Sequence, residues 1–479
     1  MSPPARPRAR RPYWLAPVFV AMLFGPPAWV TAAMLATAAC VSLTLGVRRA
    51  FGGRSGGSHE REEGVVLGVD PRGREIVLTD RQLSAHGLIL GASGAGKSTT
   101  LLTILTDHVR RGRPVIAIDM KGSPAFVEEL SAAAAAAGRP FAVWSLDGPS
   151  IWNPLRHGNP TQLKDKLIAT ERFTEPHYQR AAERYVQMVL RVLELAHPGR
   201  APTLADVVTL MDPRRVPAVL RDVPRDTRER VQDYLSQLTP DQVSAARGLG
   251  TRLAVLTESH TGQYLQPTTG AHEIDLHAAL SGDEVVVFSL NSSSYGRLAA
   301  QLGTLAIQDL VSASGERLSS GPVSALPQAI VGIDEFSALG ADHLIGLVAR
   351  GREPKVSVVF ATQELADMER VARGLREQLV GNAAVKIIHR QDVPDSALMV
   401  AQMAGTELVW ERTIQTGAGP LGRYTTRGGT RRQVERFVVH PNQIKTLGTG
   451  DAIMLTKQPA AQTRAMHVRP PQRGGRELG

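Results

Sequence analysis

Residues 91–98 read GASGAGKS and match every fixed position of the pattern G-x-x-x-x-G-K-[ST]. The residues before them, 86–90, form a short apolar run typical of a buried strand, and residues 99–110 carry apolar side chains at helical spacing. At such a junction, backbone N–H groups and the positive end of the helix dipole converge on one spot, which favours phosphate oxygens. The pattern therefore predicts a nucleoside triphosphate site. We expect this site to be formed by Gly91, Ser93, Gly94, Ala95, Gly96, Lys97, Ser98 and Thr99.

Four side chains have the chemistry to bind ATP with Mg²⁺ and to hydrolyse it. Lys97 would reach the β- and γ-phosphates, and the Ser98 hydroxyl would coordinate the metal ion. An apolar run at residues 329–333 ends in Asp334 and Glu335. P-loop enzymes use one acid to hold Mg²⁺ and often a second to polarise the attacking water, and we assign Asp334 to the first role and Glu335 to the second. A plain helix N-cap is the alternative for such an acid pair, and the intact phosphate loop disfavours it.

Two further side chains flank a third apolar strand, at residues 356–360. Gln363 follows this strand, where an amide can sense the γ-phosphate or orient water. Arg352 precedes the strand and is our candidate for an arginine finger supplied to a neighbouring subunit, with a solvated helix end as the alternative. For Arg350 we favour the solvated helix end.

Length and composition limit the classes of protein to consider. With 479 residues the chain has room for more than one domain, and its net charge of +10 favours a polyanionic partner such as nucleic acid or anionic lipid. Much of that charge lies at the two ends of the chain. Cys40 is the only cysteine, so an internal disulfide is excluded and the main body fits a reducing cytosol.

The N-terminal residues predict a membrane anchor at residues 1–51. Residues 13–47 carry no charge, and residues 28–47 are long enough for one helix to cross a ~30 Å hydrocarbon core. Arginines flank both ends of the run, and positive charge tends to stay cytoplasmic. We therefore expect a helical hairpin in the inner or plasma membrane with the main body on the cytoplasmic side. A single span with an interfacial first segment is the alternative.

The rest of the chain alternates strand and helix patterns, which predicts an α/β fold with a mainly parallel sheet. A flexible linker at 52–63 precedes a nucleotide-binding domain whose first part is 64–159 and whose second part is 271–457. Residues 160–270 lack strand patterns and predict an all-helical insertion. We expect a disordered basic tail at 458–479. For the Gly/Arg-rich stretch at 417–432 we favour a solvated loop over a contact to a phosphate backbone.

The chain resembles a known family, the TraG/TraD-like coupling proteins of conjugative type IV secretion, in the FtsK/HerA-related P-loop superfamily. An N-terminal membrane segment is followed by the segments LGVDPRGREIVLTD, HGLILGASGAGKST, IDMKGS, WNPL, VGIDEFSALG, ARGREPKVSVVFATQ and GNAAVKIIHRQDVPDSALMVAQMAGT, with a helical insertion after WNPL. The resemblance covers most of residues 60–457. It also marks Asp119 and Lys121, in the family's D-x-K-G, as neighbours of the active site.

The resemblance implies a membrane-anchored, RecA-like hexameric ATPase that passes a relaxase with its DNA, most simply single-stranded, to a secretion channel. Lys97 and Ser98 would then bind nucleotide, and Asp334 and Glu335 would drive hydrolysis. Gln363 would be the sensor, Arg352 would act on the neighbouring subunit, and the helical insertion would meet DNA or the relaxase.

Two alternatives stay open. The first is an FtsK-like translocase of double-stranded DNA, although few residues remain after the last predicted strand for the DNA-reading module that such motors usually carry. The second is a membrane-tethered receptor that binds nucleotide without hydrolysing it. The intact set of Lys97, Asp334 and Glu335 disfavours the second alternative.

Overall fold

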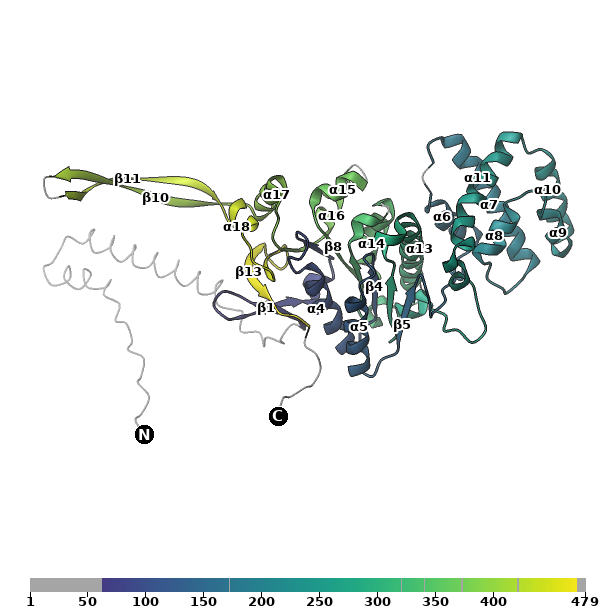
Figure 1. The fold of residues 1–479 in the computed structure, drawn as a ribbon, viewed down its shortest axis with the longest axis horizontal. Coiled ribbons are helices and arrows are strands. Elements are labelled where there is room, and N and C mark those ends of the chain that lie inside the picture. Colours follow the sequence, from purple (N-terminus) through teal and green to yellow (C-terminus); the bar gives the residue numbers. More distant parts are fainter. Residues whose placement is uncertain are drawn as a thin grey trace, which may run out of the picture. The chain divides into compact units, whose positions relative to one another are not determined.

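The computed structural model describes residues 63–471, except 172, 320, 340, 372–373 and 420–421. The described residues belong to one compact unit, Glu63–Gly479. Its centre is an 11-stranded sheet with the order β2-β1-β13-β12-β9-β3-β8-β7-β4-β6-β5 (Figure 1). The strands are β1 (Gly64–Val69), β2 (Glu75–Thr79), β3 (Gly87–Leu90), β4 (Val115–Asp119), β5 (Phe141–Ser145), β6 (Val285–Ser289), β7 (Ala329–Asp334), β8 (Val356–Thr362), β9 (Val385–Ile388), β12 (Asp451–Thr456) and β13 (Gln462–Val468).

The part of the sheet from β9 to β5 is parallel throughout, which confirms the predicted α/β class. Its strands are near-continuous apolar runs because both faces are covered. In β4, Ile116 and Ile118 belong to one buried cluster, whereas Val115 and Ala117 belong to the other. Helices α4 (Lys97–Arg110) and α5 (Pro124–Ala136) supply the cluster with Val115, and α13 (Ser292–Ser319) and α14 (Ala341–Gly351) supply the other.

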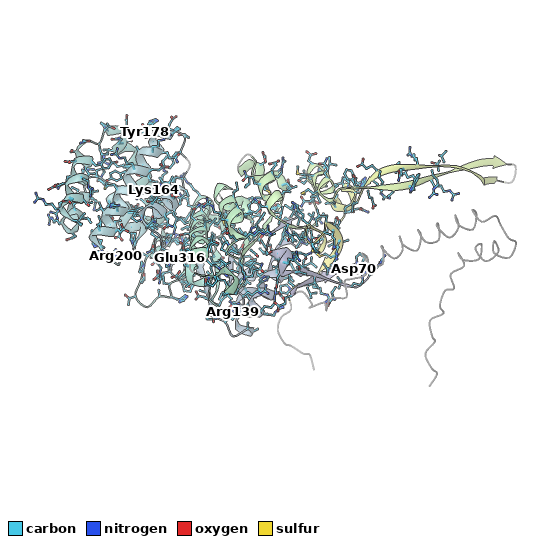
Figure 2. All side chains as sticks on the ribbon, turned by 180° about the vertical axis from the view of Figure 1, so that it is seen from behind. Asp70, Arg139, Lys164, Tyr178, Arg200 and Glu316 are labelled. Carbon is cyan, nitrogen blue, oxygen red and sulfur yellow. The ribbon has the colours of Figure 1, made fainter. Side chains whose placement is uncertain are left out.

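A helical insertion separates β5 from β6. It comprises α6 (Pro160–Ile168), α7 (Pro176–Ala196), α8 (Leu204–Leu210), α9 (Val216–Val219), η2 (Leu220–Asp222), α10 (Arg225–Ser236) and α11 (Pro240–Glu258). Its buried side chains continue the core of the sheet through Trp152, whose ring centroid lies 5.0 Å from that of Phe288 on β6. Polar side chains cover its surface, among them Lys164, Tyr178 and Arg200 (Figure 2).

Shorter helices connect the remaining strands. They are α3 (Asp80–Leu83), η3 (His260–Leu265), α12 (Leu276–Ala279), η4 (Val323–Ala325), η5 (Phe336–Ala338), α15 (Leu365–Val371), α16 (Leu375–Asn382), α17 (Pro394–Ala404) and α18 (Pro441–Lys445).

The predicted disordered tail at 458–479 is wrong for its first part. Residues 462–468 form β13, which pairs antiparallel with β12 on one side and with β1 on the other. Met466 and Val468 of this strand are buried in the core, while His467 between them is exposed. Alternating buried and exposed side chains are typical of a half-buried strand. The alternating segment is short, and the surrounding proline, glycine and arginine residues make it hard to recognise in the sequence.

The predicted solvated loop at 417–432 is also wrong. β10 (Thr406–Gly419) and β11 (Gly422–Phe437) pair antiparallel and form a two-stranded sheet of their own (Figure 1). Threonines and other residues with good strand propensity recur along both segments, and the glycines obscured this pattern.

The predicted membrane anchor at residues 1–51 lies outside the described residues. Within residues 63–471, the described helices include none long and apolar enough to cross a membrane.

Candidate nucleotide-binding site

The loop after β3 has the backbone conformation that its glycines predict. Gly96 has a φ of +117°, which side chains rarely permit, and α4 begins at the next residue, Lys97. Gly91 leaves no space for a side chain, because a Cβ there would lie 2.7 Å from the Cβ of His389. The N–H groups at the start of α4 are therefore presented at the carboxyl edge of the sheet, as a phosphate site requires.

Lys97 is buried and folded back onto this loop. Its Nζ donates to the backbone oxygens of Gly91, at 2.6 Å, and of Ala92, at 3.1 Å. Burial and repulsion from Lys121 lower the pKa of Lys97, and attraction by Glu335 opposes this change. A phosphate group would relieve that burial cost by giving the ammonium group an anionic partner.

Ser98, Lys121 and the two predicted acids meet beside the loop. The Ser98 hydroxyl donates to Asp334 Oδ2 at 2.6 Å. Lys121 Nζ lies 3.3 Å from Asp334 Oδ2 and 3.4 Å from Glu335 Oε2. Burial tends to lower the pKa of Lys121, but the two carboxylates outweigh it and raise the pKa overall. The four side chains thus form one polar cluster at the carboxyl ends of β4 and β7.

The cluster fits a divalent cation. Asp334 is 1% exposed, and its Oδ1 is buried without a hydrogen-bond partner, while its Oδ2 already shares the Ser98 hydroxyl. A hydroxyl and a carboxylate at this spacing are the oxygen ligands that Mg²⁺ takes from P-loop proteins. Lys121 occupies Asp334 Oδ2 in this structure, so it would have to yield part of that contact to the ion.

Glu335 differs from Asp334 in backbone and in exposure. It has a φ of +56°, in the left-handed region, and its side chain is 14% exposed. Non-glycine residues in this region cost of the order of 1–3 kcal/mol and concentrate at functional sites. The turn directs Glu335 away from the path of β7, next to Lys121.

Asp119 supports the cluster from the end of β4. Its carboxylate accepts the backbone N–H of Lys121 at 3.0 Å and that of Ser123. Burial, with a contribution from the charge of Asp334, raises the pKa of Asp119 to about 6. Asp119 therefore orders the turn that carries Lys121.

The structure brings Gln363 to the site and leaves Arg352 away from it. Gln363 follows β8, whose last residue, Thr362, pairs with Leu90 just before the phosphate loop. Arg352 precedes β8 and is close enough to His86, which precedes β3, to lower the pKa of that residue further after burial has done so. The length of β8, ~20 Å at about 3.3 Å per residue, thus separates Arg352 from the pocket of its own chain.

His389 is a residue of the site that sequence reasoning missed. It follows β9 and is fully buried beneath the phosphate loop, where its Nδ1 donates to the backbone oxygen of Asp451 at 2.9 Å. Its Nε2 accepts from the Thr100 hydroxyl on α4 at 2.8 Å. Burial lowers the pKa of His389 to about 4, so the ring is neutral and this pattern is stable. Its position after a buried strand was the only available signal.

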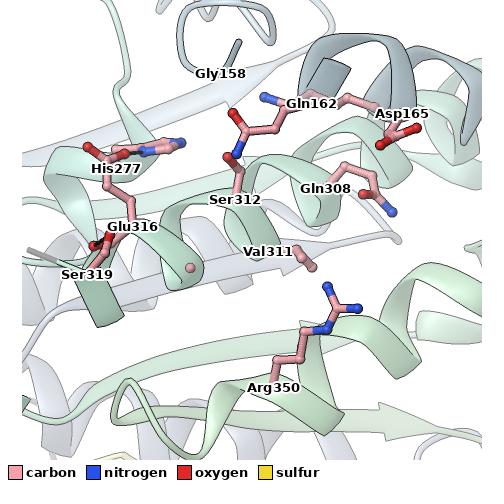
Figure 3. Close-up of a pocket in the computed structure, with 12 residues that line it drawn as sticks. Gly158, Gln162, Asp165, His277, Gln308, Val311, Ser312, Glu316, Ser319 and Arg350 are labelled. Atoms are coloured by element: carbon pink, nitrogen blue, oxygen red, sulfur yellow. Dashed lines mark hydrogen bonds and ion pairs between the residues drawn. The ribbon is translucent and has the colours of Figure 1, made fainter. Parts of the chain in front are cut away.

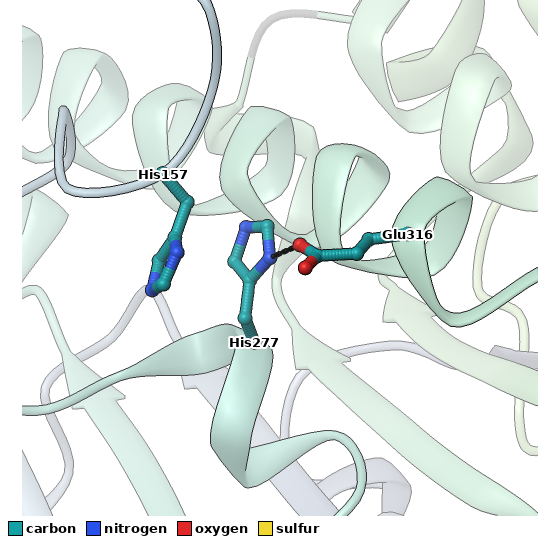
Figure 4. A group of neighbouring side chains, drawn as sticks. All are labelled: His157, His277 and Glu316. Atoms are coloured by element: carbon teal, nitrogen blue, oxygen red, sulfur yellow. Dashed lines mark hydrogen bonds and ion pairs between the residues drawn. The ribbon is translucent and has the colours of Figure 1, made fainter. Parts of the chain in front are cut away.

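A second polar region lies at the base of the helical insertion, apart from the phosphate loop. A cavity of about 620 Å³ there is lined by α6, α12, α13 and α14, with His277, Glu316 and Arg350 around it (Figure 3). His277 Nδ1 lies 2.5 Å from Glu316 Oε2, and its ring stacks on His157 with 4.1 Å between centroids (Figure 4). Burial tends to lower the pKa of His277, but Asp309 and Glu316 raise it overall.

Beneath this cavity, a buried ion pair joins the insertion to the core. Lys166 on α6 and Asp309 on α13 are 2% and 4% exposed, and Lys166 Nζ lies 2.7 Å from Asp309 Oδ1. Trp152 Nε1 donates to the other oxygen of Asp309.

We expect Asp309→Asn to destabilise the protein by about 3 kcal/mol or more, because it leaves the Lys166 ammonium buried without its counter-charge. Thermal unfolding of the full chain measures this loss. The double variant Lys166→Met/Asp309→Leu serves as control and should recover most of it. Equal destabilisation by the single and double variants would show that the hydrogen bonds, and not the charge balance, carry the effect.

Comparisons with known proteins agree with this geometry. Residues 329–449 match the family model described as the TraM recognition site of TraD and TraG, and residues 65–138 match the helicase HerA-like C-terminal model. The comparison with curated proteins found no match.

Solved structures extend the likeness to most of the chain. The bacterial conjugative coupling protein TrwB, in its unbound monoclinic form, superimposes with a TM-score of 0.63 at 14% identity, over 86% of this chain and 90% of its own. TrwB in complex with ADP and Mg²⁺ gives 0.61 at 14% identity, over 87% and 92%. VirB4 of Thermoanaerobacter pseudethanolicus gives 0.55 at 16% identity, over 85% and 96%.

The phosphate loop, the acids after β7 and the helical insertion thus occur together on the fold of a P-loop NTPase. The two family models match separate segments, residues 65–138 with the phosphate loop and residues 329–449 with the two acids. The chain is thus similar to TraG/TraD-like coupling proteins in two segments of its sequence, and it shares the fold of the conjugative coupling protein TrwB.

Proposed function

We propose that this protein is an ATPase that couples ATP hydrolysis to the delivery of DNA, with its relaxase, into a conjugative type IV secretion channel. The observation that carries the proposal is the cluster of Ser98, Lys121, Asp334 and Glu335 beside an intact phosphate loop. A protein that only bound nucleotide would not need a second acid held in a strained turn at this position.

We assign a role in ATP hydrolysis to each residue of the cluster, and also to Lys97 and Gln363. Lys97 would leave the carbonyl oxygens of its own loop and bind the β- and γ-phosphates. Ser98 and Asp334 would hold Mg²⁺, which neutralises the phosphate charge during transfer. Glu335 would accept a proton from the attacking water, and Gln363 would orient that water or register the γ-phosphate. Until nucleotide arrives, Lys121 would offset the mutual repulsion of the two acids, since its Nζ contacts both carboxylates.

The relatives support the identity of the ligand and the pathway. TrwB is described as a plasmid coupling protein, and its structures contain ADP with Mg²⁺ and a non-hydrolysable ATP analogue. By analogy we assign ATP and Mg²⁺ as cofactors, a homo-hexamer as the working assembly, and secretion-channel components as partners. The uncharged run at residues 13–47 supports anchoring in the inner or plasma membrane with the body in the cytoplasm.

ATP turnover in the presence of DNA tests this proposal. We expect the purified full chain to hydrolyse ATP and to do so several-fold faster with single-stranded DNA, because a translocating motor is driven by its substrate. DNA binding should tolerate any sequence and weaken steeply as salt rises, since phosphate contacts release counterions. Both are measured with oligonucleotides of unrelated sequence over a range of salt concentrations.

The alternatives give different results in the same assay. Stimulation by duplex DNA but not by single strands would favour an FtsK-like translocase. Nucleotide binding without turnover under any of these conditions would favour a receptor that uses nucleotide as a structural ligand. Turnover that does not respond to any DNA would contradict the proposed substrate and point to protein cargo alone.

A further inference from the structure

The β10–β11 hairpin carries an exposed face that no other described element covers. In the strand register, Trp410 is opposite Gln433 and Arg412 is opposite Arg431, so these four residues share one face. Trp410 is 59% exposed, and Leu408 on the same face is 67% exposed. An isolated two-stranded sheet is marginally stable in water, so a hairpin of this length requires a partner.

The charges on this face indicate what the partner is. Arg412 and Arg431 are direct cross-strand partners, and like charges in that relation are destabilising. On the opposite face the charges are balanced, because Arg432 pairs with Glu411 at 3.1 Å and Arg436 is opposite Glu407. On the first face, Glu435 lies opposite Leu408 and accepts a hydrogen bond from the Thr406 hydroxyl. The Arg412–Arg431 pair therefore has no carboxylate opposite it, which favours a polyanion at that pair.

The aromatic side chain narrows the class of polyanion. The Arg431 guanidinium lies over the Trp410 ring, 5.5 Å from its centroid. Bases of single-stranded nucleic acids stack on aromatic rings and on arginine planes, while neighbouring arginines contact the phosphates. A membrane surface would require a broader apolar strip, because interfacial binding scales with buried apolar area. On this face Leu408 and Trp410 are the large apolar side chains described as exposed, since Phe437 at its base is partly buried against the core.

We propose that the face defined by Trp410, Arg412 and Arg431 binds single-stranded nucleic acid. A base would stack against Trp410 and Arg431, and adjacent phosphates would bind Arg412 and Arg431. The identification of that nucleic acid as DNA rests on the function proposed above. The hairpin would thus hold the transported strand outside the nucleotide-binding domain.

Tryptophan fluorescence of the full chain tests this interaction directly. Trp144 and Trp152 are at most 1% exposed, so solutes reach them poorly. Subtracting the spectrum of Trp410→Phe from that of the parent isolates the Trp410 signal from every other tryptophan in the chain. We expect a 20-nucleotide oligo-dT to quench this difference signal and to protect it from acrylamide.

Affinity measurements supply the matched control. Trp410→Ala should weaken binding of the oligonucleotide about 5- to 150-fold, the range found when a base–aromatic stack is removed. Arg412→Gln/Arg431→Gln should reduce the slope of log affinity against log salt by about 1.4, at about 0.7 for each phosphate that is no longer neutralised. Arg432→Gln/Arg436→Gln removes the same net charge from the opposite face and should leave the slope near that of the parent. Unchanged ATP binding in each variant verifies that the main body is folded.

Four outcomes would overturn the proposal. Oligo-dT that binds without changing the Trp410 signal would place the DNA site elsewhere and leave the proposed function intact. A blue shift of Trp410 with vesicles of phosphatidylglycerol, and none with DNA, would assign the face to the membrane. An equal decrease of the salt slope in the two arginine double variants would reduce the effect to net charge. Absence of both DNA binding and DNA-stimulated turnover would contradict the proposed function as well.

Discussion

We expect Glu335→Gln to bind ATP with near-normal affinity and to lose ATP turnover by about 10³-fold or more, since the amide cannot accept the proton of the attacking water. Glu335 is 3.4 Å from Lys121, and the hydrogen bonds and ion pairs described for it include none to the phosphate loop. Its charge acts on Lys97 only at longer range, so its loss should change ATP affinity little. Glutamine also keeps the volume and backbone preference of the side chain in the turn. Single-turnover hydrolysis and binding of a fluorescent ATP analogue measure the two quantities separately.

Two control variants separate a loss of ATP turnover from a loss of ATP binding. Lys97→Ala should show the opposite pattern, with weakened binding, because it removes the ammonium group that balances the phosphates. Asp119→Asn should lower turnover less than Glu335→Gln does and weaken ATP binding less than Lys97→Ala does. Asp119 acts through the turn that carries Lys121, because its carboxylate accepts the backbone N–H groups of Lys121 and Ser123. Normal turnover in Glu335→Gln would remove Glu335 from its assigned role, and Asp334 would then have to serve both functions.

The parts of the site that lie close together in sequence were predictable, and the contacts between distant parts were not. The loop from Gly91 to Ser98 and the strand ending in Asp334 each carry a local pattern. Their meeting depends on the order of β3, β8, β7 and β4 in the sheet, which the pattern of each strand does not specify. His389 illustrates the limit, because a histidine after an apolar strand indicates nothing about the loop that packs on it until β9 is placed beside β3.

Local composition predicted the wrong structure in two segments whose conformation depends on pairing with distant strands. Residues 462–468 look like part of a polar tail, but β12 and β1 both present an unpaired edge to them, and hydrogen bonding to two neighbours outweighs weak local propensity. The stretch from 417 to 432 contains several glycines and arginines, which are typical of loops. Its partner strand, β10, supplies the register that makes it a hairpin. In both places the decisive interaction came from another segment.

Arg352 lies at the opposite edge of the sheet from the phosphate loop of its own chain, and its substitution should greatly lower ATP turnover. Arg352 lies at the amino end of β8, whereas its own phosphate loop is at the carboxyl edge of the sheet. It therefore cannot complete the pocket of its own chain without a large rearrangement, and we propose that it reaches the pocket of a neighbour. A finger of this kind contributes about 10³-fold or more to the rate. Arg352→Ala and Lys97→Ala should each be nearly inactive as pure assemblies.

Mixing the two inactive variants tests the shared site. A subunit with Arg352→Ala keeps an intact Lys97 pocket, and a neighbour with Lys97→Ala keeps an intact Arg352, so some interfaces regain both groups. In a ring formed from equal amounts, about a quarter of the interfaces have this arrangement, and ATP turnover should recover to at most that fraction of the parent rate. Turnover is measured after the subunits have been dissociated, mixed and reassembled, with each unmixed variant treated in the same way.

Arg350→Ala is the matched control for this experiment. Arg350 is two residues away, lies in the last turn of α14 and borders the cavity at the base of the insertion, so its loss should leave turnover near the parent rate. A pure Arg352→Ala assembly with parental turnover would refute the finger outright. Two inactive variants that stay inactive on mixing would contradict independent sites in the ring, because a complete pocket would then be present without activity. Recovery on mixing would establish that hydrolysis takes place between subunits, with Lys97 on one side of the interface and Arg352 on the other.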